Sequence, residues 1–507
     1  MKICLIRPPI LCPKSHPIVQ MTPPIGLAYV AGSLRDAGYE VTVIDGLAES
    51  FDTRHNWGED CYLYGLSIEQ ILDGIDETTD VIGVSAAFTF EWPVCRELIK
   101  QLRERFPNVR LIGGGEHITA LPELSMEETP LEVGVLGEGE EIVINLVKAF
   151  EANETDLSKI GGIVYRNEQG DIVRNERHNR IRELDDIPRP AWEYLPIEQY
   201  LDRGFGFGVT RGRSMPVIAS RGCPYQCTFC SNPKMWTTRW VVRSVDNMLD
   251  ELEYYQKTYG AQNFDFYDLT AIVKKTWIVE FCEKIEQRRM KFTWQLPSGT
   301  RSEAIDDEVS QLLYKSGCRN LSYSPESGSP TVLARIKKKI KTEAMLTSLR
   351  STVNAGMNIK LNIMFGFPGE TYKEIRESFK FICQMAWAGG HDLSIWAFSP
   401  YPGSELFDQL YKEGKIKMDD AYYDDLRSYS DMSRCKSFSE HIDNKTLMRL
   451  RWLGTVLFYG VGWLRRPWRP FRMVWNGFTG RHESRSDLVI TSLLRRMKLV
   501  KKSKEAG

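Results

Sequence analysis

The stretch SRGCPYQCTFCSN, residues 220–232, places three cysteines within eight positions. Cys223, Cys227 and Cys230 follow a short apolar run, MPVIAS (215–220), which we expect to be a buried strand. The loop after a strand is where parallel β/α folds present their reacting groups. The stretch therefore predicts a chemical site in a β/α fold, and the spacing of its thiols narrows the choice of ligand.

Three ligands compete for this thiol cluster. A structural zinc ion needs four ligands, usually as two C-x2-C pairs, and no nearby His completes the set. The next thiols, Cys282 and Cys318, lie in a predicted helix and before a predicted strand. A disulfide is disfavoured by the odd number of thiols and by the lack of paired spacings among the eleven cysteines. A [4Fe–4S] cluster held by three thiolates keeps one iron open, an asymmetry that is typical of a catalytic centre.

Length and composition indicate a globular protein of two or three domains. The chain has 507 residues, of which 42% are hydrophobic and 26% are charged, and single cores stop growing at about 300 residues. No charged-then-apolar leader opens the sequence. We therefore expect a cytoplasmic protein with reduced thiols.

Charge is distributed unevenly along the chain. From Lys445 onward there are 15 Lys and Arg residues and 3 Asp and Glu residues, which gives +12 there and leaves −13 for the preceding part. This end either binds an anionic partner, such as a membrane surface or an anionic substrate, or folds back onto the acidic body. Its segment WLGTVLFYGVGWL (452–464) is too short to span a bilayer, which needs about 20 helical residues. We expect a helix there that either packs on the preceding domain or lies in the headgroup plane.

Residues 1–150 predict an open, doubly wound, Rossmann-like α/β domain. Five apolar runs rich in Val, Ile and Leu show little alternation, as is typical of parallel strands covered on both faces. Helical segments at 25–38 and 92–106 suit crossover connections. Such a sheet binds ligands beyond the carboxyl ends of its strands. The five runs are KICLIRPPI (2–10), YEVTVIDG (39–46), DVIGVSA (80–86), VRLIGGG (109–115) and EVGVLGEG (132–139).

The rest of the chain divides into three parts. Residues 151–205 are expected to be a linker with a hairpin that turns near residues 169–170. Residues 206–430 hold six β/α units, which fit a partial (β/α)6 barrel of the TIM type. Residues 431–507 are expected to form a basic, aromatic and mainly helical end. The six strand candidates are MPVIAS (215–220), NFDFYDL (263–269), FTWQLP (292–297), RNLSYSP (319–325), NIKLNIMFG (358–366) and DLSIWAFSP (392–400).

The motif C-x3-C-x2-C after the first strand of such a barrel resembles that of the radical S-adenosylmethionine (SAM) superfamily. Phe229, before the last cysteine, matches the aromatic residue usual in that family. The resemblance implies that Cys223, Cys227 and Cys230 ligate a [4Fe–4S] cluster whose open iron chelates SAM. It also implies reductive cleavage of SAM to a 5′-deoxyadenosyl radical, with an electron from an external flavodoxin- or ferredoxin-like reductant.

Segments after the second to fifth barrel strands resemble the SAM-binding loops of the same family. A carboxylate suits the ribose hydroxyls, and a glycine-rich turn lets the backbone lie along the adenine. The SAM-binding residues so implied are Asp268, Arg301, Glu326, Ser327, Gly366 and Gly369. Asp268 stands where many members carry a Gly-Gly-Glu loop for the amine of SAM, and Arg301 equally suits an ion pair at the barrel rim.

An open α/β domain in front of this barrel resembles the cobalamin-binding subgroup, over residues 1 to about 430. Segments 23–34, 80–86, 113–123 and 136–142 fall where that subgroup places its cobalamin-facing loops. The cobalamin-binding residues so implied are Ser85, Gly113, Gly114, Gly115, His117, Gly137 and Glu138. The sequence lacks D-x-H-x-x-G, whose His ligates cobalt, so we expect cobalamin without a His ligand and His117 as a hydrogen-bonding residue. The carboxylate of Glu138 also suits a helix start.

The leading hypothesis for function is methylation of an unactivated carbon through methylcobalamin, with a further SAM to remethylate cobalt. The alternative is radical oxidative cyclisation or rearrangement of a tetrapyrrole, lipid or natural product. The anaerobic cyclase of bacteriochlorophyll synthesis belongs to that branch. The aromatic, arginine-rich end of this chain resembles the ends of enzymes in the same branch. A third hypothesis, a cluster-bearing electron carrier or sensor, stays open. Such a protein would not cleave SAM after reduction.

A tRNA methylthiotransferase would need a second cluster, for which Cys12, Cys61 and Cys95 are available, and a small basic β-barrel domain that does not follow here. We therefore expect a small-molecule or lipid-like substrate and no nucleic acid. The basic aromatic end predicts peripheral contact with the inner face of the membrane.

Overall fold

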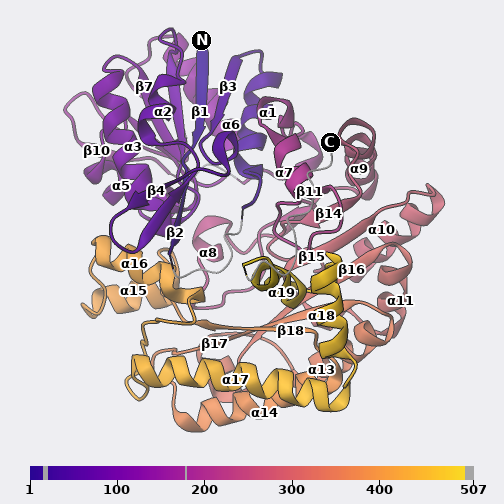
Figure 1. Ribbon diagram of the computed structural model, residues 1–507. Helices are drawn as coiled ribbons and strands as arrows, with labels where there is room; N and C mark the ends of the chain where they lie inside the picture. The colour runs from indigo at the N-terminus through magenta and orange to yellow at the C-terminus, as the bar shows by residue number, and fades with distance from the viewer. Residues whose placement is uncertain (15–20, 177–179, 497–507) are drawn as a thin grey trace.

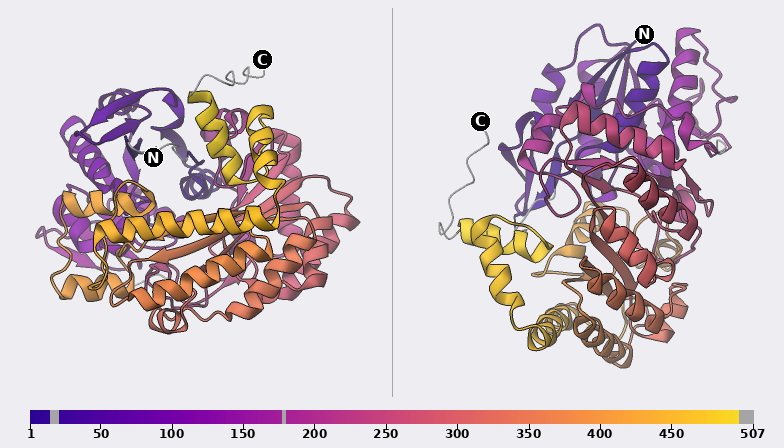
Figure 2. Two further views of the ribbon diagram at one scale, coloured as in Figure 1. Left: turned by 60° about the horizontal axis from the view of Figure 1, so that its bottom comes forward. Right: turned by 90° about the vertical axis from the view of Figure 1, so that its right-hand side faces the viewer.

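The computed structural model describes residues 1–14, 21–176 and 180–496. A sheet-based N-terminal domain lies above a second, barrel-like sheet (Figure 1). Of the three C-terminal helices, the first runs along the lower side and the next two lie in front of the barrel sheet (Figures 1 and 2). The predicted order of a Rossmann-like domain, a partial barrel and a helical end is therefore confirmed.

All five strands predicted in the first 150 residues are present and parallel. They form the order β8-β7-β6-β1-β3 within a seven-stranded sheet. The strands are β1 (Lys2–Arg7), β3 (Glu40–Asp45), β6 (Val81–Ser85), β7 (Arg110–Gly114) and β8 (Val133–Val135). The helices of this domain are α1 (Ile25–Asp36), α2 (Ile68–Asp73), α3 (Trp92–Arg105), α4 (Glu116–Ala120), α5 (Pro122–Glu128) and α6 (Gly139–Glu151).

The continuous apolar runs form strands because both faces of this sheet are buried. Ile3 and Leu5 of β1 enter a core shared with α1 and α6, whereas Cys4 and Ile6 of the same strand enter a core shared with α3. Successive side chains point to opposite faces, so a strand covered on both sides needs an apolar residue at every position.

The hairpin predicted in the linker forms, but it belongs to the N-terminal sheet. Strands β9 (Ile163–Arg166) and β10 (Ile172–Arg174) are antiparallel, and β9 pairs with the edge of β8. The domain therefore continues past residue 150, because the hairpin covers an edge strand whose backbone groups need partners. A further antiparallel sheet, which we did not predict, joins β2 (Ile10–Pro13), β5 (Cys61–Tyr64) and β4 (Arg54–Trp57).

The six predicted barrel strands form one open parallel sheet, in the order of the chain. They are β11 (Ser214–Val217), β14 (Asn263–Phe266), β15 (Thr293–Thr300), β16 (Cys318–Glu326), β17 (Asn358–Phe365) and β18 (Asp392–Ala397). The two strands β12 (Ser220–Arg221) and β13 (Val241–Val242) pair beside the barrel. The longer helices of this part are α9 (Val245–Tyr259), α10 (Lys275–Gln287), α11 (Asp307–Lys315), α13 (Thr342–Asn354) and α14 (Tyr372–Ala388); the shorter ones are α8 (Asn232–Met235), α12 (Pro330–Arg335), α15 (Glu405–Lys412) and α16 (Asp420–Arg427), and α7 (Ile197–Arg203) lies in the linker.

Three helices follow the barrel: α17 (Asn444–Arg465), α18 (Arg469–Thr479) and α19 (Arg485–Arg496). Helix α17 runs along α14 and contacts β18 (Figures 1 and 2). Its buried stripe includes Gly454, where a Cβ would lie 2.5 Å from Cδ1 of Ile395, and Arg451, whose guanidinium donates to the carbonyls of Ile395 and Asp431. The predicted packing of this segment on the barrel is confirmed for that face.

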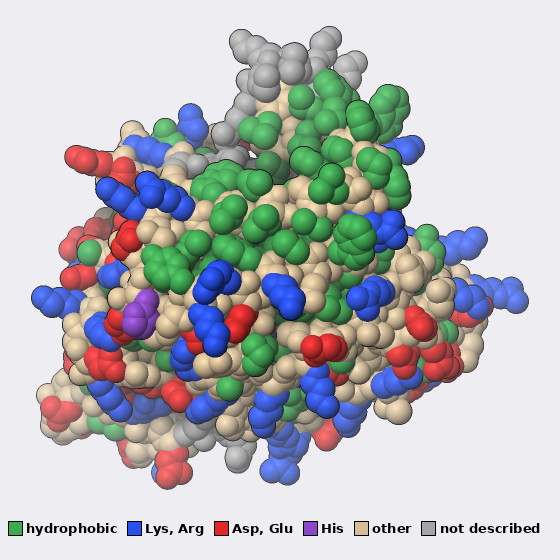
Figure 3. Space-filling model, turned by 90° about the horizontal axis from the view of Figure 1, so that it is seen from below, with side chains coloured by type: hydrophobic (Ala, Val, Ile, Leu, Met, Phe, Trp, Pro, Cys, Tyr) green, Lys and Arg blue, Asp and Glu red, His purple; other side chains and the backbone are tan. Residues whose placement is uncertain are grey.

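The outer face of the three helices is rich in hydrophobic side chains (Figure 3). Within the described part of the chain, no helix combines the length and the apolar composition needed to cross a membrane.

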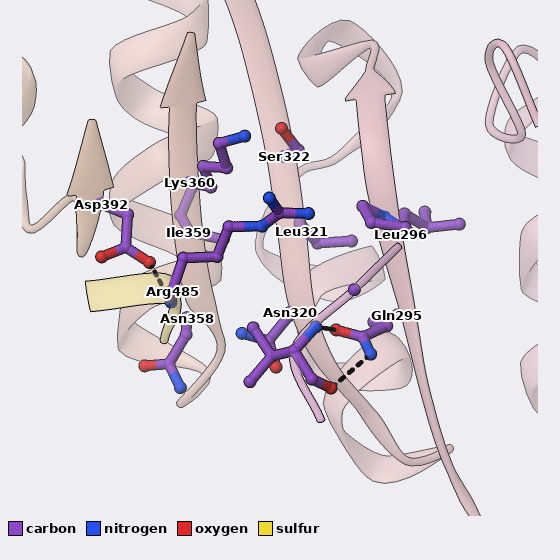
Figure 4. Close-up of a pocket in the computed structure, with 13 residues that line it drawn as sticks. Gln295, Leu296, Asn320, Leu321, Ser322, Asn358, Ile359, Lys360, Asp392 and Arg485 are labelled. Atoms are coloured by element: carbon purple, nitrogen blue, oxygen red, sulfur yellow. Dashed lines mark hydrogen bonds between the residues drawn. The ribbon is translucent and has the colours of Figure 1, made fainter. Parts of the chain in front are cut away.

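The turn before α19 closes the amino-terminal end of the barrel. The carbonyl of Glu483 accepts hydrogen bonds from Asn320 and Asn358, at 2.8 and 2.9 Å, and Asp392 accepts from the backbone N–H of Arg485 at 2.7 Å. The side chains of Lys360 and Arg485 extend into the space above this turn (Figure 4). That cavity measures about 20 Å³, which is room for a single water molecule.

Candidate functional site at the domain junction

The loop with the three cysteines starts from a rigid anchor. Asp268, which follows β14, accepts hydrogen bonds from the backbone of Ala219 and from the backbone and hydroxyl of Ser220. Burial raises the pKa of this carboxyl to about 6. The resemblance places Asp268 near the amine of SAM, which stays a prediction; in the structure its carboxylate fixes the chain that leads into the cysteines.

The three thiols lie half-buried on the short loop between β12 and α8. The loop is held at Cys223, whose carbonyl accepts from Asn232 at 3.1 Å, and at Cys230, whose N–H donates to the Cys227 carbonyl at 3.1 Å. Burial raises the pKa of the Cys230 thiol to about 12. Ligation to a cationic centre supplies the charge that a thiolate needs in such surroundings.

In the described ranges, no three His, Cys, Asp or Glu side chains are already gathered as a metal site. The three cysteines as cluster ligands therefore stay a prediction, carried by their spacing and by their place after the first barrel strand.

Two cations lie beside the thiols. Lys338 pairs with Glu326 at 3.0 Å, and the guanidinium of Arg301 lies 3.9 Å above the ring of Tyr225, inside the cysteine loop. Burial raises the pKa of Cys223 and Cys227, and both cations act against that rise. The Nε–H of Arg301 is buried and has no partner among the described residues. The surroundings thus fit an anionic cluster and the carboxylate of SAM.

In the turns after β16 and β17, most of the residues predicted to contact SAM form hydrogen bonds with other residues of the protein. Ser327 bonds the hydroxyl of Ser378 on α14 at 3.0 Å, so its hydroxyl faces that helix. Gly366 and Gly369 have φ of +91° and +69°, and their N–H groups donate to Glu370 and Glu440 at 2.6 and 2.8 Å. Glu326, by contrast, is buried at the end of β16, where it pairs with Lys338 and lies close to the loop that carries the thiols.

The carboxyl ends of β6, β7 and β8 carry small residues. Gly115 has φ of +115°, and a Cβ there would lie 2.5 Å from the Ala86 carbonyl oxygen. At Gly114 a Cβ would lie 3.7 Å from Cβ of Val135, in ordinary van der Waals contact. Gly113 differs, since a Cβ would lie 2.7 Å from Ile118 in the core. Together with Ser85 and Gly137, the second and third glycines offer a large planar ligand a close approach to backbone.

His117 is fully buried and does not form the hydrogen bonds that we expected. Its ring stacks on Trp92 at 4.2 Å and meets the edge of Tyr423 at 6.0 Å. Neither ring nitrogen has a partner among the described residues, and burial lowers its pKa to about 3. The imidazole is therefore a neutral packing group, enclosed by aromatic rings of the N-terminal domain and of α16.

A buried ion-pair network joins the two domains, and the sequence did not reveal it. Arg221, two residues before Cys223, lies 3.2 Å from Glu138 and 2.5 Å from Glu140; Arg180 lies 3.0 Å from Glu138. Glu138 was predicted at the cofactor; in the structure its carboxylate accepts these bonds, and its contact with cobalamin stays a prediction. The only available signal was the Arg of SRGC beside the acidic run GEGEE, about 80 residues apart in the sequence.

A second link crosses the same junction. The hydroxyl of Ser231, which follows Cys230, donates to the carboxylate of Glu116 at the start of α4. Both links connect the carboxyl edge of the N-terminal sheet to the cysteine loop. The loops expected to face cobalamin and the thiols expected to hold the cluster thus meet at one place, as required for two cofactors that serve one reaction.

The match to known families agrees with this geometry. Residues 17–147 match the B12 binding domain, and residues 217–382 match the radical SAM superfamily. The chain belongs to the cobalamin-dependent radical SAM enzymes, whose cofactors are a [4Fe–4S] cluster, SAM and cobalamin.

Three relatives are similar over most of this chain. An uncharacterized methyltransferase of Pyrococcus horikoshii is 30% identical over 414 residues, 80% of this chain and 83% of the relative. Cytidylyl-2-hydroxyethylphosphonate methyltransferase of Streptomyces wedmorensis is 27% identical over 440 residues, 80% and 81% of the two chains. The anaerobic magnesium-protoporphyrin IX monomethyl ester cyclase of Cereibacter sphaeroides is 27% identical over 401 residues, 78% of this chain and 61% of the relative.

A solved structure has the same fold. The radical S-adenosylmethionine methyltransferase TsrM of Kitasatospora setae, determined with cobalamin and a [4Fe–4S] cluster bound, superposes with a TM-score of 0.65. The two share 17% identity, over 91% of this chain and 89% of TsrM.

Proposed function

We propose that this enzyme methylates an unactivated carbon of a small-molecule or lipid-like substrate. The observation that supports it most is the junction, where Arg221 ties Glu138 and Glu140 to the start of the cysteine loop. When bound, the cluster and SAM supply an organic radical, and cobalamin supplies the methyl group. Substrate would then lie between the two domains, within reach of both.

The residues of the chain would share this work as follows. Cys223, Cys227 and Cys230 would hold the cluster as thiolates. Lys338 and Arg301 would lower the electrostatic cost of its negative charge, and the free Nε–H of Arg301 is available to an anionic group of SAM. Glu326 would accept from ribose hydroxyls, with its charge balanced by Lys338.

On the other side of the junction, small residues would hold cobalamin. Ser85, Gly114, Gly115 and Gly137 lie at or directly after the carboxyl ends of three adjacent parallel strands. Without bulky side chains there, backbone groups can approach a corrin ring closely. Buried His117 lies behind this edge and would support the α4 loop instead of contacting the cofactor.

Isotope transfer from SAM tests the proposed reaction. The reconstituted enzyme, a chemical reductant and SAM with a deuterated methyl group are incubated without oxygen with small-molecule and lipid extracts. We expect 5′-deoxyadenosine and S-adenosylhomocysteine to form together, and the label to enter one extract. The Cys223→Ser variant should form neither product, whereas Cys383→Ser, at a half-buried thiol on α14, should behave as wild type.

One relative favours a second candidate, radical cyclisation without methyl transfer. The Cereibacter sphaeroides cyclase is as similar in sequence as the phosphonate methyltransferase, at 27% identity. Formation of deoxyadenosine with no label in either extract would favour cyclisation and would contradict methylation.

We also propose two partners. An external one-electron donor of the flavodoxin or ferredoxin type would reduce the cluster, because nothing in the proposed reaction supplies that electron. The enzyme would work at the inner face of the membrane, in keeping with the basic and apolar C-terminal helices and with the net charge of +12 from Lys445 onward.

A further inference from the structure

The C-terminal helices expose an apolar face that the rest of the protein leaves uncovered. On α17, Trp452 and Val456 lie opposite the stripe that packs on the barrel, and Leu464 at its end is 83% exposed. On α18, Phe471 is 78% exposed and Trp475 is 65% exposed. Monomeric proteins rarely leave such a gathering of large apolar side chains in water without a partner for it.

Helix α18 is oriented with its polar side inward, and specific bonds hold it so. Its buried residues are Asn476 and Gly477. The Asn476 amide donates to Asp487 at 3.1 Å and to Glu483 at 3.3 Å, and a Cβ on Gly477 would lie 2.7 Å from Cγ2 of Ile490. Turning Phe471 and Trp475 inward would break these bonds and leave the buried Asp487 carboxylate with only its backbone partners, the N–H groups of Glu483 and Ser484. The apolar face therefore points outward as a fixed feature of the fold.

The charge around this face identifies the kind of partner. Residues 444–496 contain 11 Lys and Arg residues and only 2 Asp and Glu residues, Glu483 and Asp487, which bond within the helical unit. Lys445, Arg449 and Arg465 are exposed. Lys and Arg side chains lie beside the hydrophobic ones in Figure 3. Two copies of the chain would bring two basic rims together, so self-association through this face is opposed by charge.

We propose that α17, α18 and α19 dock the enzyme on an anionic phospholipid bilayer. The side chains of Phe471 and Trp475 enter the boundary between headgroups and acyl chains, and the surrounding cations contact lipid phosphates. Tryptophan suits this depth because its ring is apolar while its N–H stays hydrated. This docking surface would place the enzyme at the membrane, as the proposed function requires, and in that respect it rests on the proposed function. Binding to the bilayer itself needs no catalytic step.

Vesicle flotation with the cofactor-loaded full chain tests this surface. We expect binding to vesicles that contain phosphatidylglycerol and much less binding to pure phosphatidylcholine, with the difference reduced by high salt. The double variant Phe471→Ser/Trp475→Ser should lower the partition coefficient by about tenfold or more. Arg449→Glu/Arg465→Glu should remove the preference for phosphatidylglycerol.

A matched control replaces exposed aromatic residues elsewhere. Tyr372→Ser/Tyr411→Ser, on α14 and α15, should bind vesicles as wild type does. Reductive cleavage of SAM should be unchanged in all three variants, which shows that they are folded.

Three results would overturn the proposal. The wild type could bind neither kind of vesicle, or Phe471→Ser/Trp475→Ser could bind vesicles as strongly as the wild type does. Light scattering could also show a dimer formed through this face in place of vesicle binding. Loss of methyl transfer with vesicle binding intact would contradict the proposed function alone and leave the docking surface standing.

Discussion

Replacing Arg221 by methionine removes the cation that joins the two halves of the site. Its guanidinium lies 3.2 Å from Glu138 and 2.5 Å from Glu140, and all three side chains are less than 10% exposed. Methionine keeps a similar length but leaves Glu140 without its cation, while Arg180 still pairs with Glu138. Removing one member of a buried ion pair costs about 3–5 kcal/mol. We expect a loss of that size in the free energy of unfolding.

Urea denaturation followed by circular dichroism measures this loss in the transition of the N-terminal domain. The control is Arg213→Met, whose guanidinium pairs with Glu198 and Asp202 at the surface and should cost less than about 1 kcal/mol. The Arg221 variant should also retain less cobalamin, because the loop after β8 is no longer held to the cysteine loop. Equal urea midpoints for the two variants, with cobalamin retained in both, would refute the reasoning.

Further predictions concern single residues of the site. Gly115→Ala should weaken cobalamin binding about tenfold or more, because φ is positive there and a Cβ would lie 2.5 Å from the Ala86 carbonyl oxygen. The control Gly26→Ala, where a Cβ has no atom within 4 Å, should bind cobalamin as wild type does; an absorbance titration measures both. The unfolded chain protonates His117 near pH 6.5 and the folded one near pH 3, so wild type should lose about 1.4 kcal/mol of stability per pH unit below 6.5. His117→Phe should lack this component in urea midpoints compared at pH 5 and 7. Arg301→Gln should raise the Kd for SAM about tenfold. Arg319→Gln, at a half-buried arginine near the start of β16 that bonds the Tyr314 carbonyl, should leave it unchanged; equal constants for the two variants would remove Arg301 from the SAM site.

The elements of both domains were predictable because their signals are local. Continuous apolar runs gave the parallel strands, and the helices at 245–259 and 372–388 lie between the cap residues that the sequence shows, Ser244 with Gly260 and Thr371 with Gly389. The pairing of the β9–β10 hairpin with β8 was not predictable. A hairpin pattern in the sequence predicts that two strands pair with each other, but it does not predict which edge of which sheet they extend.

The contacts of the predicted site residues were harder to foresee, since they depend on partners far away in the sequence. Glu138 suits a helix start by local criteria, yet its carboxylate binds Arg221, 83 residues later. Ser327 looks like part of a ligand loop, but its hydroxyl bonds Ser378, 51 residues later. The three thiols were identifiable because their ligand spacing is local. Likewise, a mainly helical end was predicted, but the bond from Asn476 to Asp487 shows which face of α18 points outward.

Electron paramagnetic resonance of the anaerobically reconstituted, reduced protein tests the central claim most directly. The account predicts the signal of a reduced [4Fe–4S] cluster that shifts when SAM is added, and its loss in Cys223→Ser, Cys227→Ser or Cys230→Ser but not in Cys383→Ser. A protein that takes up zinc in place of iron at these thiols, or a cluster signal that SAM leaves unchanged, would contradict it.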